Sequence, residues 1–347
     1  MSSHIVGVDI GQTAIRAVEA KALRGGVIEI RGYQEAALPE GAVRGGGVVE
    51  AALVASTLKK MWATGRFGTK DVILGMGDQK VVARDLVMPK ASKAQMRELL
   101  PMRVQELIPM PVADAIIDFY PVADAPPTDE GPAVRGLLIA AYAAAVTTNV
   151  AVVRRAGLRV SEVDFIPFAL QRAVGSTAEG VSAVVDIGAS TTNVVIATRG
   201  VPDFVRIIPM GSDDATRALV AELELPHDQA EQLKIAQGLH GEIVPPNTAK
   251  SSGIVLNVTR DLVTSIVNTL RYYSSTHDNA KVETLVLTGN GARLRGLPSA
   301  VLQATGITVS PPEPFSRVRM PKTLASFAVS EALIAGTAFG LAMGVRA

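Results

Sequence analysis

Apolar and polar positions repeat along the chain with two periods, one typical of strands and one typical of helices. Short apolar or alternating runs predict strands at 6–11, 15–20, 27–33, 71–76, 81–87, 115–120, 137–143, 158–165, 201–208 and 284–287, and a hairpin of two strands at 184–197. Helical spacing of apolar residues predicts helices at about 49–63, 92–107, 148–157, 213–223, 227–237 and 255–274, near Pro167 and Pro298, and at the end of the chain. Strands that alternate with helices are typical of layered α/β proteins.

The pattern changes between 81 and about 132, where short elements are separated by prolines. The helix predicted at 92–107 contains Pro101, and proline in a helix interior costs roughly 3 kcal/mol or more because it lacks an N–H group. The stretch 123–132 is rich in Pro, Asp and Gly and predicts a loop. Thr147, Thr148 and Asn149 predict a capped helix start near 148. The segment therefore predicts a small α+β insertion.

Composition limits the class of protein. With 347 residues, 48% of them hydrophobic, the chain is long enough for about two domains and a large core. It has 34 basic and 33 acidic residues, and the net charge of +1 gives no argument for a nucleic-acid partner. The absence of cysteine excludes disulfides, zinc–thiolate sites, iron–sulfur clusters and cysteine nucleophiles. The N-terminus lacks a signal-peptide pattern, and the polar residues within the uncharged run 136–153 favour a strand and a helix over a membrane span.

A duplicated motif is the strongest signal in the sequence. Around Asp9 and again around Asp186, an apolar strand is followed by Asp-Ile-Gly, small polar residues and a returning apolar strand. Gly11 and Gly188 allow the backbone to approach an anion closely, and the N–H groups and hydroxyls of such a turn can hold a phosphate. The two carboxylates suit a Mg²⁺ ion that is held through water. Two copies in corresponding places predict a cleft that binds phosphates from both sides.

Two further motifs are ambiguous when each is taken alone. An apolar strand ends in Gly289-Asn290-Gly291, a turn where a flat ring could lie against bare backbone, although a turn without a ligand explains it equally well. Glu231 and Lys234 lie on one predicted helix face, where a surface ion pair is the simpler interpretation. Other chemistries lack their motifs, since the sequence has no H-x-x-x-H pair, no G-x-S-x-G elbow, no G-x-x-x-x-G-K-[ST] loop and no G-x-G-x-x-G after a strand.

Together these motifs resemble those of the actin-like ATP-binding superfamily, which combines two D-x-G phosphate loops with a late L-T-G-x-G-x-x-x-x-G-L adenosine motif. The insertion is more specific. Val87-Met-Pro, followed after a helix by the run 106–119, resembles the small subdomain of the PilM family of type IV pilus assembly proteins, which are relatives of the FtsA division proteins. The runs 163–170 and 230–234 are similar to that family as well.

The resemblance implies an α/β, actin-like (ribonuclease H-like) fold with two duplicated lobes and a small inserted α+β subdomain. The expected division is a first lobe (1–80 and 151–178), the insertion (81–150), a second lobe (179–326) and a C-terminal helix (327–347) that packs back on the first lobe. The implied function is that of a cytoplasmic ATP-binding scaffold, which binds the N-terminal cytoplasmic peptide of a PilN-like inner-membrane protein in a groove next to the insertion, with other pilus assembly components as further partners. The partner would hold it at the inner face of the cytoplasmic membrane. The oligomeric state stays open, a homo-oligomer included.

By matching positions, the resemblance assigns residues to a site for ATP and Mg²⁺. The first phosphate loop would comprise Asp9, Gly11, Gln12, Thr13 and Arg16, and the second Asp186, Gly188, Ser190 and Thr191, with Asp9 and Asp186 holding Mg²⁺ through water. The adenosine would be surrounded by Glu231, Lys234, Gly289, Asn290, Gly291 and Arg293. Three of these depart from the family pattern: Gln12 replaces a small hydroxyl residue, Asn290 a glycine and Arg16 a lysine. Because the planar guanidinium is not equivalent to the point charge of lysine, the nucleotide preference stays open.

Hydrolysis is less strongly indicated than binding. Phosphoryl transfer needs a group that orients the attacking water. Gln171 lies roughly where actin carries such a residue, but its position on a helix favours an exposed, non-catalytic side chain, so we expect slow turnover at most. Two alternatives share the fold. A sugar or acid kinase needs a catalytic base and a polar substrate pocket, for which we find no segment. An FtsA-like division protein usually ends in a basic amphipathic helix, which Val345-Arg-Ala does not provide.

Overall fold

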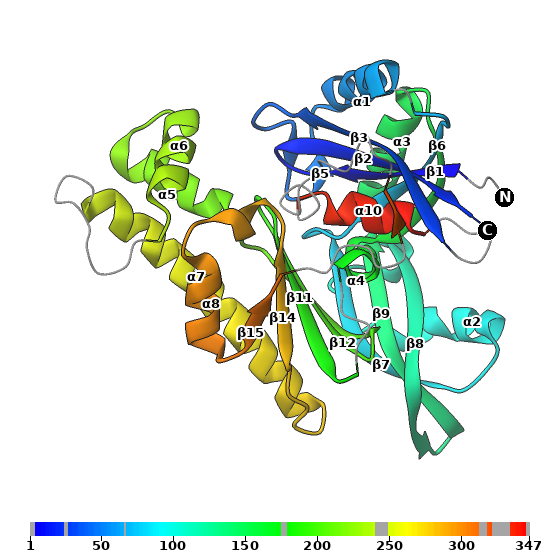
Figure 1. Cartoon of the computed structure of the whole chain (residues 1–347). Coiled ribbons are helices and arrows are strands. Elements are labelled where there is room, and N and C mark those ends of the chain that lie inside the picture. Colours follow the sequence, from blue (N-terminus) through cyan, green and yellow to red (C-terminus); the bar gives the residue numbers. More distant parts are fainter. Residues whose placement is uncertain are drawn as a thin grey trace.

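The computed structural model describes residues 4–23, 27–65, 67–174, 179–239, 249–311, 318–320 and 334–344. Two β-sheets form the centres of two lobes, and a third sheet belongs to the insertion (Figure 1). The strand order is β10-β6-β1-β2-β3-β16 in the first lobe, β13-β12-β11-β14-β15 in the second and β7-β9-β8 in the insertion. The boundary expected at 178/179 and the start of the C-terminal helix at 327 fall on or beside residues outside the described ranges.

The first sheet is covered by helices on both faces. It consists of β1 (His4–Ile10), β2 (Ala14–Ala22), β3 (Ile28–Ala37), β6 (Asp71–Met76), β10 (Arg159–Phe165) and β16 (Val318–Arg319). One face packs on α1 (Ala51–Gly65) and α3 (Ala143–Arg155), and the other on α4 (Ile166–Val174) and α10 (Gly336–Ala342) (Figure 1). A short hairpin of β4 (Val43–Arg44) and β5 (Gly47–Val48) precedes α1. Burial on both faces explains why β1 and β6 are nearly continuous apolar runs.

The second lobe repeats this plan. Its sheet contains β11 (Val181–Ile187), β12 (Thr192–Thr198), β13 (Val201–Ile208), β14 (Thr284–Thr288) and β15 (Thr308–Ser310). On the outer face lie α7 (Ala249–Thr276) and α8 (Leu297–Thr305), and the inner face packs against α4 and α10 of the first lobe. A separate layer of α5 (Asp213–Leu223) and α6 (His227–Gln237) lies against the first half of α7. The predictions at 213–223 and 227–237 are confirmed, whereas α7 is longer than predicted.

The inserted sheet is larger than the sequence predicts. Its central strand β9 (Gly131–Tyr142) pairs with β7 (Val81–Pro89) and with β8 (Ala115–Thr128). The stretch 123–132, expected to be a loop, forms the end of this long β8–β9 hairpin, so that expectation is wrong. Proline is tolerated in β8 because this is an edge strand, where half of the N–H groups point to solvent, and the register shifts next to Pro121 and between Ala125 and Thr128.

Two helix boundaries also differ from the predictions. Helix α2 (Lys93–Arg103) begins after Ser92, which caps it in a capping box with Gln95, but it ends at Arg103 instead of 107, with Pro101 in its last turn. Helix α3 begins at Ala143 and not near 148. Asn149 does not cap this helix, because its buried amide accepts from the N–H of Val48 at 3.4 Å. The cap prediction is wrong since a tertiary contact uses the polar side chain.

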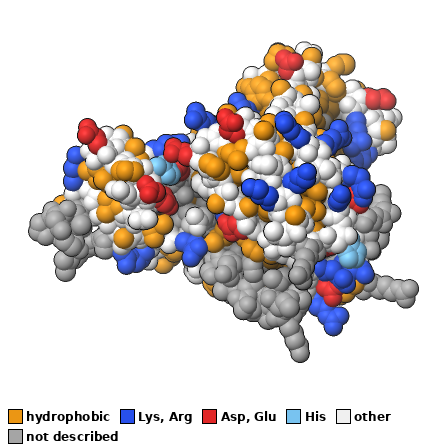
Figure 2. All heavy atoms as spheres, turned by 90° about the horizontal axis from the view of Figure 1, so that it is seen from above, with side chains coloured by type: hydrophobic (Ala, Val, Ile, Leu, Met, Phe, Trp, Pro, Cys, Tyr) orange, Lys and Arg blue, Asp and Glu red, His pale blue; other side chains and the backbone are white. Residues whose placement is uncertain are grey.

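Side chains of both charges are distributed over the surface. On the face shown in Figure 2, basic, acidic and apolar side chains are all visible, and several Lys and Arg side chains lie close together on the right of the view.

Candidate functional site

A cavity of about 180 Å³ lies between the two lobes. Every residue that the sequence assigns to the two phosphate loops lines this cavity, and so do Glu231, Gly289 and Asn290 of the predicted adenosine site. Lys234, Gly291 and Arg293 do not line it. The structure thus brings together most of the predicted site from segments that are far apart in the sequence.

The two D-x-G hairpins have the same geometry. Asp9 in β1 is paired with Arg16 in β2, and Asp186 in β11 is paired with Asn193 in β12. In the first turn the N–H of residue 11 donates to the carbonyl of residue 14 at 3.0 Å, and in the second the N–H of residue 188 donates to the carbonyl of residue 191 at 2.9 Å. Both turns point into the cavity, which is the arrangement that the duplicated motif predicts.

The carboxylates of Asp9 and Asp186 influence each other across the cavity. Burial raises the pKa of Asp9 above its ordinary value. Burial, and next the charge of Asp9, raise the pKa of Asp186 to about 7, against the lowering effects of Arg16 and of a hydrogen bond from Asn193. Such a pair is stabilised by a bound cation. The described residues include no group of three or more His, Asp or Glu side chains placed to hold a metal ion, so a cation here would keep water or phosphate ligands.

Arg16 is only partly neutralised by protein groups. One terminal nitrogen (Nη2) donates to Glu35 Oε1 at 2.9 Å, and Glu35 also accepts from the Tyr33 hydroxyl at 2.6 Å. The Nε atom of Arg16 is buried without a hydrogen-bond partner, although the side chain lines the cavity. A buried donor without a partner is costly, so this group favours an anion in the cavity.

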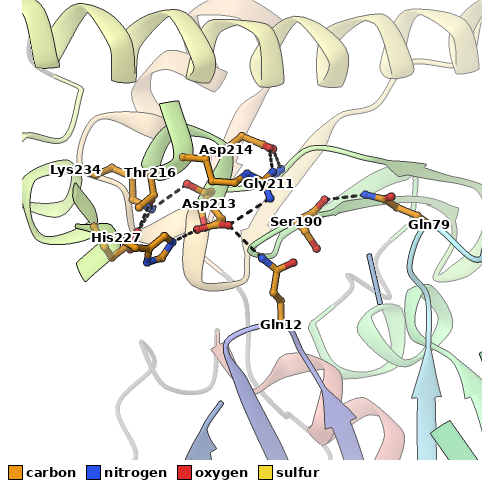
Figure 3. Close-up of polar contacts among 12 residues, drawn as sticks. Gln12, Gln79, Ser190, Gly211, Asp213, Asp214, Thr216, His227 and Lys234 are labelled. Atoms are coloured by element: carbon orange, nitrogen blue, oxygen red, sulfur yellow. Dashed lines mark hydrogen bonds and ion pairs between the residues drawn. The ribbon is translucent and has the colours of Figure 1, made fainter. Parts of the chain in front are cut away.

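Two hydrogen bonds join the lobes at the cavity (Figure 3). Gln12 Nε2 of the first lobe donates to Asp213 Oδ2 of the second at 3.2 Å, and Gln79 Nε2 donates to the carbonyl of Ser190 at 3.5 Å. Ligand pockets typically measure about 300–1,000 Å³, so a cavity of about 180 Å³ is small for a nucleotide. These two contacts hold the lobes together at the cavity.

Lys234 is a buried structural cation and not one half of a surface ion pair (Figure 3). Its Nζ donates to the carbonyl of Ser212 at 2.9 Å, to Thr216 Oγ1 at 2.9 Å and to Glu231 Oε2 at 2.6 Å. The side chain is buried, so the simpler interpretation of this pair is wrong. All three donors are used within the protein, and Lys234 therefore fixes the position of Glu231 and of the start of α5.

The glycine turn after β14 packs tightly against the second hairpin. Gly289 has a φ of +84°, and a Cβ atom there would lie 2.5 Å from the carbonyl oxygen of Ile187. Gly291 is buried, and its Cβ would lie 2.4 Å from the Ile187 side chain. Both glycines are therefore required by packing. Arg293, in the short 3₁₀ helix 290–293 that follows Gly289, is exposed and faces away from the cavity lining.

Residues of the β13–α5 connection line the cavity but escaped the sequence analysis. The N–H of Ser212 donates to the carbonyl of Gly188 at 2.9 Å, and Asp213, which is buried, accepts from His227 Nε2 at 2.8 Å. Asp78 and Asn149 of the first lobe also line it, and burial raises the pKa of Asp78 to about 6. The signal that could have located the connection is Met-Gly-Ser-Asp-Asp directly before a helix, because a glycine and polar residues often mark a helix N-terminus.

Gln171, considered as a water-orienting residue, does not line the cavity. Its side chain is buried, and its Nε2 donates to the carbonyl of Gly200 at 3.5 Å. The expectation that this side chain is exposed is therefore wrong, and its packing supports a structural role.

A second groove, of about 640 Å³, lies beside the insertion. One wall comes from α2 and β8, with Leu100 and Ile116, and the other comes from β10 and α4, with Val163 and Phe168. Its floor contains two aromatic rings in tilted contact, since the centroids of Tyr120 and Phe168 lie 4.7 Å apart at an interplanar angle of 49°. Charged side chains surround this apolar floor: Lys93, Arg97, Asp118, Glu162 and Asp164.

Comparisons with solved structures identify the fold. The chain superposes on a structure described as the PilM–PilN type IV pilus biogenesis complex with a TM-score of 0.84 and 24% identity, covering 100% of this chain and 99% of that one. It also resembles the ethanolamine utilization protein EutJ from Carboxydothermus hydrogenoformans (TM-score 0.57, 15% identity, covering 98% and 89% of the chains). A nucleotide-free diol dehydratase-reactivating factor gives a TM-score of 0.53 at 10% identity, covering 98% and 99%. A comparison with curated protein sequences found no match.

These similarities and the duplicated hairpins around the cavity define an actin-like protein with two lobes, as the sequence predicts. The model of the type IV pilus assembly protein PilM matches residues 7–346, so the chain belongs to the PilM family. This result does not favour the kinase or the FtsA-like alternative. None of the helices within the described ranges has the length and apolar character that a membrane span requires.

Proposed function

We propose that this chain is an ATP-binding scaffold of type IV pilus assembly. A PilN-like membrane protein would hold it at the inner face of the cytoplasmic membrane. The main support for ATP binding is that two equivalent glycine turns and two buried carboxylates line one cavity. The partner is supported by membership of the PilM family and by the likeness to a PilM–PilN complex.

The residues of the cavity fit a phosphate chain with a hydrated Mg²⁺ ion. The backbone N–H groups of Gln12, Thr13 and Ser190 make no hydrogen bond within the described parts of the chain, so they are free to donate to phosphate oxygens. Arg16 would add a positive charge through its unpartnered Nε. Asp9 and Asp186 would accept hydrogen bonds from the water ligands of a Mg²⁺ ion, and that ion would neutralise part of the phosphate charge.

Calorimetric titration with Mg²⁺-ATP tests this site. The wild-type protein should bind, and Asp9→Asn and Asp186→Asn should lose the increase in affinity that Mg²⁺ provides. Asp129→Asn is the matched control, because Asp129 is exposed in the β8–β9 turn, remote from the cavity. Equal Mg²⁺-dependent binding by all four proteins would show that the carboxylates are not the metal site, and absence of wild-type binding would refute ATP as the ligand.

The groove beside the insertion suits an extended peptide. Its apolar floor can take side chains of a short segment, and its charged margins can orient that segment. We propose that the N-terminal cytoplasmic peptide of the PilN-like partner binds here, between α2 and β8 on one side and β10 and α4 on the other. Other pilus assembly components would join through this complex.

Binding of a fluorescent synthetic peptide, with the N-terminal sequence of the PilN-like protein of the same genome, tests the groove. Ile116→Asp and Val163→Asp place a charge on the walls at positions that are 48% and 36% exposed, so both should fold and bind at least about tenfold more weakly, because a charge must then be buried. Val87→Asp is the control, since Val87 is 45% exposed but lies outside the groove. An equal loss of peptide affinity in all three variants would contradict the assignment of this groove as the peptide site.

We further propose that ATP is hydrolysed slowly, because Gln171 is engaged elsewhere. Steady-state phosphate release near the enzyme median of about 10 s⁻¹ would refute this proposal. The division into lobes at 1–80, 81–150, 151–178, 179–326 and 327–347 also stays a proposal. The packing of α3 on α1 within the first lobe supports moving the end of the insertion from 150 to Tyr142.

A further inference from the structure

A groove runs along the outer face of the second lobe, between the neighbouring helices α7 and α8 (Figure 1). It consists of two hollows of about 470 and 290 Å³, which share Val267, Arg271 and Ala304 and are therefore continuous. This groove is separate from the cavity between the lobes and from the groove beside the insertion. It lies on the face of the second sheet that points away from the first lobe.

The floor of the groove is apolar. Leu256 and Val263 of α7 line one part, and Val282 and Ile307 line the other. Leu256 is 40% exposed, whereas Val263 is buried beneath the surface of the hollow. Apolar side chains that line a hollow can receive the apolar face of a partner.

The charge on the walls has one sign. Arg260, Arg271 and Lys281 line the groove, and no Asp or Glu does. All three cationic side chains are exposed, and none forms a hydrogen bond or ion pair with another residue in the described ranges. Each of the three is therefore available to pair with an acidic group of a partner.

The spacing on α7 matches an elongated partner. Arg260, Val267 and Arg271 are seven and four residues apart and thus lie on one face of the helix. From Leu256 to Ser274 the groove follows α7 for roughly 27 Å at 1.5 Å per residue, the length of a helix of about 18 residues.

We propose that the α7–α8 groove docks an acidic amphipathic helix of another protein. The apolar face of that helix would lie on Leu256, Val263 and Val267, and its Glu or Asp side chains would pair with the three free cations. The lining residues lie between two helices, and a flat lipid surface would contact the helix crests instead of the floor between them, which favours a helix as the occupant.

The test uses the full-length chain and a fluorescein-labelled peptide of about 18 residues, with Leu at helical i, i+3, i+4 spacing and Glu on both flanks. Fluorescence anisotropy should show binding that weakens as salt is raised, because exposed charge pairs are screened. The double variant Arg260→Glu/Arg271→Glu should weaken binding by a factor of roughly 2 to 25, since each of the two exposed pairs contributes a factor of roughly 1.4 to 5. Ala304→Trp, which fills the groove without changing charge, should also abolish binding.

Matched controls separate the groove from general electrostatics. Lys59→Glu/Arg154→Glu makes the same charge change on exposed positions of α1 and α3, and Ala52→Trp makes the same size change on α1. Both should bind as the wild type does. Equal binding of a peptide with the same composition in scrambled order, or equal loss in test and control variants, would overturn the proposal. Binding to phosphatidylglycerol vesicles that the groove variants abolish, while they leave peptide binding intact, would overturn it in favour of a membrane.

Discussion

Replacing Asp186 by asparagine should stabilise the unliganded protein at alkaline pH. In the folded state, burial and the charge of Asp9 raise the pKa of Asp186 to about 7, whereas the ordinary value is 3.8. The folded state therefore holds this proton more tightly than the unfolded state does. It follows that the stability contributed by the protonated carboxyl is present below pH 4 and is lost as the pH rises to about 7.

The magnitude follows from the difference between the two pKa values. From 3.8 to about 7, the loss is roughly 4 kcal/mol at about 1.36 kcal/mol per pH unit. Because the carboxyl faces a cavity that water can enter, we expect about half of this, ~2 kcal/mol, to be measurable. Asparagine carries no charge at any pH, so Asp186→Asn should be more stable than the wild type by about 2 kcal/mol at pH 8 and by much less at pH 5.

Urea denaturation in EDTA, at pH 5 and pH 8, measures this difference. Asp129→Asn should match the wild type at both pH values, because Asp129 is exposed. In buffer without EDTA, Mg²⁺ and ATP at pH 8 should stabilise the wild type more than Asp186→Asn, since ligand binding to the folded state raises stability and the variant lacks the Mg²⁺-dependent part of the affinity. A variant that is no more stable than the wild type at pH 8, or equally more stable at both pH values, would refute the electrostatic reasoning.

Three further changes test the frame of the cavity. Gly211→Ala places a Cβ 2.3 Å from the carbonyl oxygen of Ala189. It should lower the free energy of unfolding by about 2 kcal/mol and weaken nucleotide binding. The control Gly253→Ala has open space around the new Cβ and should leave the stability unchanged or raise it. Lys234→Met leaves three acceptors, of which Thr216 is buried, without their donor, and we expect it to lower the urea midpoint by the equivalent of about 3 kcal/mol. Gln12→Ala removes a bond between the lobes, so stopped-flow mixing should show faster nucleotide association, and an unchanged rate would contradict a closed resting state.

The sequence was sufficient for the parts of the site that rest on local backbone geometry. Gly11 and Gly188 were placed correctly because each strand, turn and returning strand is a contiguous segment with its own hydrogen-bond pattern. The duplicated position of the two aspartates then determined which ends of the sheets would meet. The local pattern of residues 210–214 marks only a helix start, and the position of that start at the cavity depends on contact with the second hairpin, where the N–H of Ser212 donates to the carbonyl of Gly188.

The failed predictions share one cause, which is competition between local and tertiary contacts. Asn149 has the chemistry of a helix cap, but its amide binds the backbone near Val48. The proline-rich stretch 123–132 has the composition of a loop, but pairing with β9 and the edge position of β8 extend it as a strand. Lys234 resembled a surface residue because two of its three acceptors, Ser212 and Thr216, belong to another segment and cannot be seen along its own helix.

The insertion and the second lobe are joined by an ion pair. Arg135 of β9, whose side chain is 30% exposed, donates to the buried Asp203 of β13 at 2.6 Å, and Asp203 also accepts from the Tyr273 hydroxyl of α7 at 3.1 Å. Removal of Arg135 would leave the buried carboxylate of Asp203 without its charged partner, so this contact is costly to break. One wall of the peptide groove belongs to the insertion, and the opposite wall belongs to β10 and α4 of the first lobe. The ion pair therefore fixes the insertion, and with it one wall of the peptide groove, to the second lobe.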